Sequence, residues 1–116
     1  MNSNGGNGAA IPGFPHAPDG WTRAEASSAA QADGVVPDES HWEAVRALQE
    51  YFARHADTPS INSRDLHDAL EEHFHSLGGM RYLYTLFPGG PVTQGCRIAG
   101  LEAPPGSADP GFGSVQ

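Results

Sequence analysis

Residues 38–54 read DESHWEAVRALQEYFAR, and this stretch decides the fold. Its large apolar side chains recur at steps of three and four residues, which places them on one face of an α-helix: Trp42, Val45, Leu48 and Phe52. Asp38 is in place to cap the helix N-terminus, and Ser40 with Glu43 offers a second capping box. The pattern predicts an amphipathic helix that ends before Pro59.

Further helical patterns lie on both sides of this stretch, and no segment alternates as a strand would. We expect one helix from Thr22 to Gly34, which starts with the capping box of Thr22 and Glu25, and another from Asn62 or Ser63 to Gly78. Two shorter helices are expected over 80–87 and over 93–98, and the second of these stops at Gly100. Their apolar positions complete the expected core: Leu66, Leu70, Phe74, Leu77, Met80, Leu83, Leu86 and Phe87. The sequence predicts a mainly α fold of several short helices.

Glycine and proline dominate both ends of the chain, which has 15 glycines and 10 prolines in 116 residues. We expect a disordered segment over 1–18, one helical domain over 19–101 and a flexible tail over 102–116. Ile11 and Phe14 are the large apolar residues of the first segment, and they are able to pack against the core as a short extended piece.

The charge balance is acidic and excludes several classes of partner. All six basic residues are arginine, and the 14 acidic residues give a net charge of −8. Because phosphate neutralisation supplies much of the affinity for nucleic acid, we expect no direct nucleic-acid binding and no anionic membrane surface as partner. We find no run of about 20 apolar residues and no signal-peptide pattern, so we expect a cytoplasmic protein.

The single cysteine, Cys96, is the candidate nucleophile, and one cysteine excludes an internal disulfide. It follows a glycine- and proline-rich turn, which suggests an accessible thiol on a mobile segment. Arg97 and a nearby helix N-terminus would favour the thiolate, the reactive form in persulfide and disulfide exchange. Gln94 and Arg97 are candidate supporting residues. The alternative is a small buried hydrophobic residue, the usual environment of an unmodified cysteine.

Histidine is frequent, with six residues, but the pattern does not favour a metal site. His67, Glu71 and His75 share one helical face, and Glu72 and His75 have the spacing that di-iron bundles use. A metal ion would need further ligands from elsewhere, and His41 or Asp38 would have to supply them. We favour a solvated acidic face without metal. The aromatic residues near Arg81 are read as helix packing, and we find no nucleotide-binding motif, so no cofactor is expected.

Several segments together resemble the DsrC/TusE family of sulfur-relay proteins, from about Asp19 to Ser107. They are DGW at 19–21, GV at 34–35, HWEAV at 41–45, Pro104 and the long block RYLYTLFPGGPVTQGCRIAGL at 81–101. The resemblance implies a small orthogonal helical bundle with a short N-terminal β-hairpin and a flexible C-terminal arm. Such proteins hand sulfur between proteins as a cysteine persulfide, or as a trisulfide between two arm cysteines.

The resemblance also implies partners and site residues. TusE-type members serve tRNA 2-thiouridine synthesis, and DsrC-type members work with dissimilatory sulfite reductase, so sulfur-donor and sulfur-acceptor proteins are the expected partners. Cys96 matches the upstream cysteine of the family's arm. Ser107 stands where the nearly universal penultimate cysteine would fall, and a serine hydroxyl cannot hold a persulfide. The prolines of the N-terminal segment are expected to degrade the hairpin.

Three functions compete on these grounds. The first is sulfur relay on Cys96 alone, by a transfer protein that needs no substrate pocket. The second is a non-catalytic paralogue that keeps the docking surface and regulates or competes with a true carrier; the serine at position 107 favours it. The third is a helix-turn-helix-like transcription factor, and the negative charge opposes it.

Overall fold

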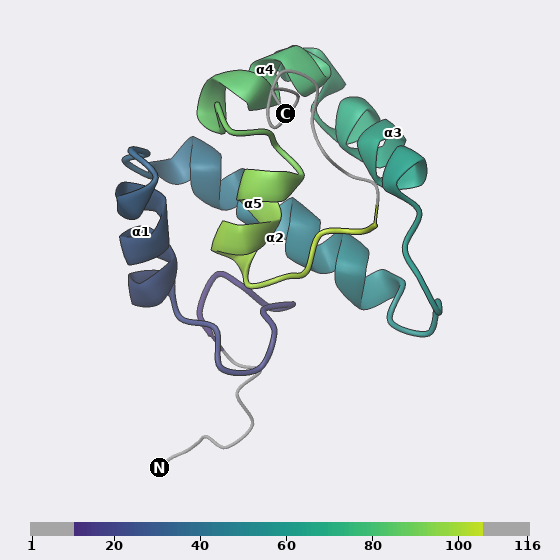
Figure 1. The fold of residues 1–116 in the computed structure, drawn as a ribbon, viewed down its shortest axis with the longest axis horizontal. Coiled ribbons are helices and arrows are strands. Elements are labelled where there is room, and N and C mark those ends of the chain that lie inside the picture. Colours follow the sequence, from purple (N-terminus) through teal and green to yellow (C-terminus); the bar gives the residue numbers. More distant parts are fainter. Residues whose placement is uncertain (1–10, 106–116) are drawn as a thin grey trace.

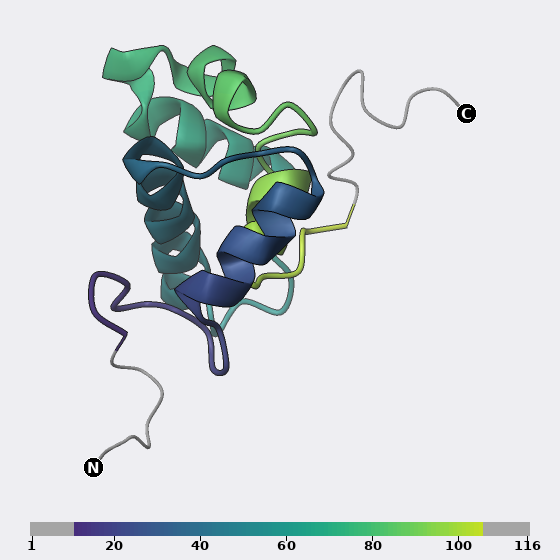
Figure 2. The same cartoon turned by 90° about the vertical axis from the view of Figure 1, so that its left-hand side faces the viewer.

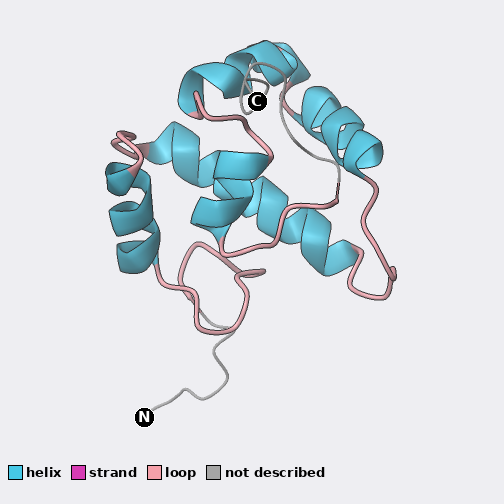
Figure 3. Ribbon diagram, viewed as in Figure 1, coloured by secondary structure: helices cyan, strands magenta, loops and turns pink. Residues whose placement is uncertain are grey.

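The computed structural model describes residues 11–105, and this part of the chain is mainly helical, as predicted (Figure 3). The helices follow in the order α1 (Arg23–Ala32), α2 (Glu39–Arg54), α3 (Ser63–His73), the 3₁₀ helix η1 (His75–Leu77), α4 (Gly79–Leu86) and α5 (Thr93–Ala99). Between residues 11 and 105 there is no strand. None of these helices is both long and apolar enough to cross a lipid bilayer.

Polar side chains cap three of the helices, and two of these caps, Thr22 and Asp38, are those that the sequence predicts. Thr22 at α1, Asp38 at α2 and Asn62 at α3 each accept a hydrogen bond from a backbone N–H of the first turn. The first amides of a helix have no partner within the helix, so these acceptors stabilise its start. Because these caps are made by residues within one helical turn, the starts of the three helices can be predicted from the local sequence.

The second capping partner at α2 is His41, not the predicted Ser40 and Glu43. The His41 Nδ1 accepts a hydrogen bond from the Asp38 backbone N–H at 3.1 Å. The other ring nitrogen, Nε2, lies 3.0 Å from the carbonyl oxygen of Leu86. His41 therefore ties the start of α2 to the end of α4, a long-range contact that a capping pattern cannot reveal.

The helices form two groups that share α2. α5 packs across α2 and against α1, while α3 packs against α4 and η1 (Figure 1). The view in Figure 2 shows α1 lying alongside α5, with α3 and α4 together at one end of the molecule. α5 is thus enclosed by other parts of the chain although it lies near the C-terminus.

Most of the predicted core is buried: Trp42, Val45, Leu48, Leu66, Leu70, Phe74, Leu83 and Phe87. Four predicted positions differ, and two of them, Met80 and Leu86, are partly buried against the core. Phe52 is only half-buried, and Leu77 is 55% exposed. α3 ends at His73 and the 3₁₀ helix follows, so the four-residue spacing that points Leu70 and Phe74 inward no longer applies at Leu77.

The segment from Ile11 to Trp21 is ordered by aromatic packing, in contrast to the disorder predicted over residues 1–18. Phe14 is buried, with its ring centroid 4.8 Å from that of Trp21 and 5.9 Å from that of Trp42. The guanidinium groups of Arg23 and Arg46 lie over the Phe14 ring. Residues 1–10 lie outside the described part of the chain.

The predicted N-terminal hairpin is absent from the described residues. The segment contains one isolated bridge, between Ile11 and Phe14, and then continues through turns. Prolines at 12, 15 and 18 remove the backbone donors that a paired strand needs. At the other end, Pro104 is buried, and the part of the predicted tail from position 106 onward lies outside the described residues.

Phe14 provides a test of the N-terminal packing. Replacing a buried phenylalanine by alanine costs about 3–5 kcal/mol, so Phe14→Ala is expected to lower the free energy of unfolding by roughly 3 kcal/mol. Urea denaturation followed by circular dichroism measures the change. Val36→Ala, at a side chain that is 80% exposed, is the control and is expected to leave stability unchanged. Equal midpoints for Phe14→Ala and the parent would show that this packing is not formed in solution.

The Asp38 cap predicts a pH dependence. The His41 side chain, whose Nδ1 lies 3.0 Å from the Asp38 Oδ1, is the largest cause that lowers the pKa of Asp38 below its ordinary value of 3.8. A carboxyl whose pKa is lowered by folding stabilises the protein above its unfolded-state pKa, and this contribution is lost as the pH falls through the folded-state pKa. Asp38→Asn keeps a capping acceptor but does not titrate. We expect the stability difference between the parent and Asp38→Asn to be present at pH 7 and to shrink below pH 3.8; a difference that does not vary with pH contradicts the assignment.

Candidate functional site

Cys96 lies in α5 and is completely buried, with 0% of its surface exposed. The accessible, mobile thiol that the flanking glycines suggest is therefore not what the structure shows. The turn at 88–91 does not mark the end of the core, because Pro91 and Val92 directly after it are buried. The chain turns at this point and brings α5 back into the centre of the molecule.

A glycine allows this close packing of α5 on α2. A Cβ atom on Gly95 would lie 2.9 Å from the Cδ1 of Leu48, which is closer than such atoms normally approach. The glycine before Cys96 thus serves the contact between two helices. The sequence-based interpretation, that it leaves the backbone beside the thiol accessible, is wrong at this position.

Side chains from two distant parts of the chain hold the C-terminal end of α5. The Trp21 Nε1 donates to the carbonyl oxygen of Ile98 at 2.9 Å, and the Gln49 Nε2 donates to the carbonyl oxygen of Ala99 at 3.0 Å. Both bonds are buried. The last carbonyls of a helix lack partners within the helix, so these two donors satisfy groups that water would otherwise solvate.

Gln49 is a functional-site residue that sequence reasoning misses, because its type places it on the polar face of α2. Its side chain is 1% exposed, and its Oε1 has no hydrogen-bond partner among the described residues. The available signal is its spacing: Gln49 follows Val45 by four residues, which places it at the edge of the apolar stripe.

The candidate supporting residues Gln94 and Arg97 meet at Asp33, at the end of α1. The Gln94 Oε1 accepts from the Gly89 backbone N–H at 3.0 Å, and its Nε2 donates to the Asp33 carboxylate at 3.3 Å. Arg97 forms an ion pair with the same carboxylate. The Arg97 side chain is exposed whereas Cys96 is buried. Arg97 thus ties α5 to α1, and its charge is directed to Asp33. A supporting role for either residue in thiol chemistry stays a prediction.

Ser107, the position that replaces the family's second cysteine, lies outside the described residues. The described part of the chain ends two residues earlier, at Pro105. The serine itself is a fact of the sequence, so Cys96 is the only thiol that the chain offers.

The candidate metal ligands are not brought together. Glu71 accepts a hydrogen bond from the Met80 backbone N–H at 2.9 Å, and the Nδ1 of His75 lies 3.9 Å from its carboxylate. His41 lies in the first turn of α2, where its Nε2 is 3.0 Å from the carbonyl oxygen of Leu86. Within residues 11–105 no group of three His, Cys, Asp or Glu side chains is arranged to hold a metal ion.

The aromatic residues near Arg81 lie in α4 and pack within the helical bundle, as the sequence predicts. Leu83 is buried, Tyr82 is half-buried with its ring centroid 6.2 Å from that of Phe74, and Arg81 is exposed.

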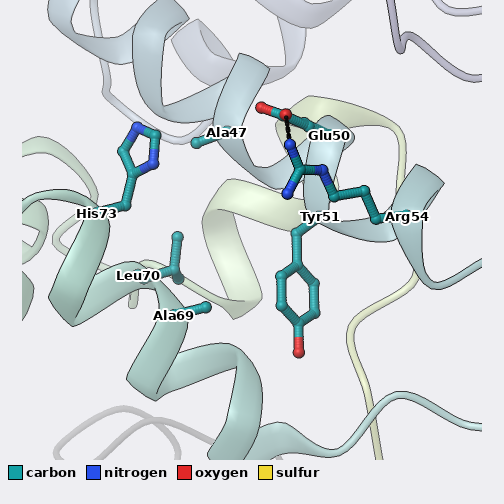
Figure 4. Close-up of a pocket in the computed structure, with 7 residues that line it drawn as sticks. All are labelled: Ala47, Glu50, Tyr51, Arg54, Ala69, Leu70 and His73. Carbon is teal, nitrogen blue, oxygen red and sulfur yellow. Dashed lines mark hydrogen bonds and ion pairs between the residues drawn. The ribbon is translucent and has the colours of Figure 1, made fainter.

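A hollow between α2 and α3 is a second surface feature, lined by Ala47, Glu50, Tyr51, Arg54, Ala69, Leu70 and His73 (Figure 4). The Glu50–Arg54 ion pair, at 2.7 Å, lies on one side of it. Burial, and to a lesser extent the charge of Asp65, raises the pKa of Tyr51, so its hydroxyl stays protonated at neutral pH. The hollow does not include Cys96, and its two alanines, Ala47 and Ala69, are small side chains.

Comparisons with known proteins agree with the resemblance found in the sequence. The family model described as DsrC like protein matches residues 10–107. Proteins named sulfurtransferase TusE match over 85 residues, with 38% identity to that of Pectobacterium atrosepticum and 39% to that of Salmonella typhimurium, over 72% of this chain and 76% of each relative. The protein of Sodalis glossinidius is 32% identical over 72% of this chain and 77% of its own length. No solved structure matches the chain.

Gly100 provides a test of how α5 is held. It ends α5 with a φ of +80°, and a Cβ atom there would lie 2.7 Å from the Cδ1 of Trp21. Gly100→Ala combines backbone strain, which costs about 1–3 kcal/mol, with a clash against Trp21. Gly34→Ala is the matched control, because Gly34 has a φ of +85° but nothing within 4 Å of its Cβ position. We expect a larger loss of stability for Gly100→Ala in urea denaturation, and equal losses would place Trp21 away from α5.

Proposed function

Because the chain belongs to the DsrC-like family, we propose that it is a sulfur-relay protein of the TusE and DsrC type that accepts sulfur as a persulfide on Cys96 and passes it to another protein. One observation carries the proposal: the family match extends over both the long block at 81–101 and its only cysteine. Relatives that match 85 residues of the chain are named sulfurtransferase TusE.

The proposed chemistry is a thiol exchange with no net oxidation. The Cys96 thiolate attacks the outer sulfur of a persulfide on the donor, the donor's sulfur–sulfur bond breaks, and the donor leaves as a thiolate with the electron pair. Cys96 then carries the persulfide. Delivery repeats the exchange in the other direction, with an acceptor thiolate attacking the outer sulfur on Cys96. No cofactor enters either step.

The partners under this proposal are proteins. A donor that carries a persulfide must meet α5, and an acceptor must follow it; by family resemblance these are a Tus-type complex, a tRNA thiolase or dissimilatory sulfite reductase. The net charge of −8 disfavours direct contact with tRNA, so a role in tRNA thiolation would run through a protein acceptor. A reducing, cytoplasmic location fits a carrier that must keep its thiol reduced.

Two observations favour a second candidate function, a paralogue that docks to relay partners without carrying sulfur. Ser107 cannot hold a persulfide, and Cys96 is buried. Such a protein would occupy the docking site of a true carrier and so compete with it. The two functions differ in one property, the ability of folded protein to gain sulfur on Cys96.

Sulfur loading tests the proposal. The protein is incubated with glutathione persulfide, or with a cysteine desulfurase that carries a persulfide, and the intact chain is weighed by mass spectrometry. We expect a gain of one sulfur atom that dithiothreitol removes and that Cys96→Ser abolishes. Addition of glutathione itself has a different mass and does not count as loading.

The outcomes separate the two functions. A reversible gain on Cys96 from either donor supports relay, and a gain from the protein donor alone shows that the donor's surface is needed. Relay on Cys96 is wrong if neither the parent nor a variant whose thiol is shown to be reactive in the folded state gains sulfur. The docking paralogue is then the better assignment.

A further inference from the structure

We infer that Trp21 and Gln49 form a latch that holds α5, and with it the Cys96 thiol, inside the core, and that the thiol becomes reactive when this latch opens while the rest of the core stays folded. The inference rests on the proposed function for its purpose, since relay requires an accessible thiol. The latch itself is a statement about the fold, and it is tested without any sulfur donor.

The closed state is defined by the burial of the thiol. Cys96 is 0% exposed, and its neighbours on α5, Ile98 and Ala99, are equally enclosed. A donor persulfide must come within bonding distance of the Cys96 sulfur, which this packing prevents. Transfer therefore requires movement of α5, and the question is which contacts have to break.

The contacts at the C-terminal end of α5 are few and specific. Trp21 and Gln49 donate to two consecutive carbonyl oxygens, those of Ile98 and Ala99, at 2.9 and 3.0 Å. One donor comes from the N-terminal segment and the other from α2, so they fasten α5 on two sides. The ring of Trp21 also covers Gly100, where a Cβ atom would have no room.

α5 is built so that it can move as one piece. It has seven residues, follows a turn that contains Gly89 and Gly90, and ends at Gly100, whose φ of +80° marks a sharp change of chain direction. Away from Trp21 and Gln49, the side chains of Gln94 and Arg97 tie the helix to Asp33 at the end of α1. Glycines before and after a short helix are suitable hinges, because they tolerate large changes in backbone angles.

The closed latch contains a polar group that would gain from opening. The Oε1 of Gln49 is buried without a hydrogen-bond partner in the described part of the chain. A buried acceptor without a partner lowers the stability of the state that contains it. Water would satisfy this oxygen once α5 lifts, so the closed state is favoured less strongly than its apolar packing alone would suggest.

Solvent already reaches the edge of the latch. A shallow hollow beside Trp21, Ile98 and Gly100 is bordered by Pro18, Asp19 and Glu25. Opening at this edge displaces Trp21 without separating α2 from α4 or α3 from α4. The inference therefore predicts a local opening, distinct from global unfolding.

Native-state thiol labelling tests the latch. The folded protein is exposed to 4,4′-dithiodipyridine, a small neutral disulfide, and the labelling rate of Cys96 is followed by absorbance at increasing urea below the unfolding transition. We expect labelling that is far slower than for the unfolded chain and whose rate depends only weakly on urea. A weak dependence indicates that little surface is exposed in the opening.

Two variants disturb the latch and one serves as a matched control. Trp21→Phe keeps an aromatic ring but removes the N–H donor, and loss of one such hydrogen bond is expected to raise the labelling rate about fivefold. Gly100→Ala displaces the Trp21 ring and is expected to raise it as well. Leu66→Val lowers global stability from α3, away from the latch, and is expected to leave the labelling rate without urea unchanged. Circular dichroism and the urea midpoint confirm that each variant is folded.

Three results would overturn the latch. The first is labelling with the full urea dependence of global unfolding, which would mean that Cys96 is reached only when the core unfolds. The second is an equal increase in all three variants, which would make global stability the cause. The third is labelling of the parent as fast as the unfolded chain, which would mean that the thiol is not enclosed. Failure of sulfur loading leaves these results unaffected, so the latch and the proposed function can fail separately.

Discussion

The crossing of α5 over α2 is the contact on which the rest of the structure depends. Gly95 brings the backbone of α5 against Leu48, and a Cβ atom at this position would require the Leu48 side chain to shift. The N-terminal segment, α1 and α2 then enclose α5, so that Cys96, Ile98 and Ala99 form part of the core. As a result the helix that carries the only thiol is also at the centre of the fold. A substitution on the buried face of α5 therefore changes both the surroundings of Cys96 and the packing of the core.

The features that the sequence predicts well are those that depend on residues within one or two helical turns. The apolar stripe of α2 and the caps at Thr22 and Asp38 are local patterns, and each lies where it was expected. Periodicity also identifies most of the core, because a helix with a single apolar face has to bury that face. It fails at Leu77, where a short 3₁₀ helix changes the direction of the side chain, and such a change leaves no mark in the spacing of apolar residues.

The features that the sequence does not predict depend on partners far along the chain. The sequence shows that Phe14 is able to pack against the core, but it does not identify the partners that bury it, Trp21 and Trp42. Gln49 has a polar side chain and is buried because it meets the end of α5. The environment of Cys96 is the clearest case: glycine and proline next to a cysteine are typical of an exposed loop, yet here the same glycines permit a close turn and a tight helix contact. Composition shows which backbone conformations a segment is able to adopt, and tertiary contacts decide whether that segment is exposed or packed in the core.

A single enclosed thiol has a consequence for how a carrier selects its donor. By the resemblance, Ser107 stands where the family has a second transfer cysteine, so under the proposed function Cys96 is the thiol that exchanges sulfur. Every exchange must then use the open state of α5, and the rate with any donor is reduced by the small population of that state. A small persulfide has no contact that favours the open state and therefore reacts at this reduced rate. A donor protein that binds the surface exposed by α5 or takes the place of Trp21 raises the population through its own binding energy, because a ligand shifts an equilibrium only by its differential affinity for the two states. If Cys96 carries sulfur as proposed, enclosure of the thiol makes the binding surface of the donor determine the rate of transfer, and the same enclosure slows the reaction of the persulfide with small thiols.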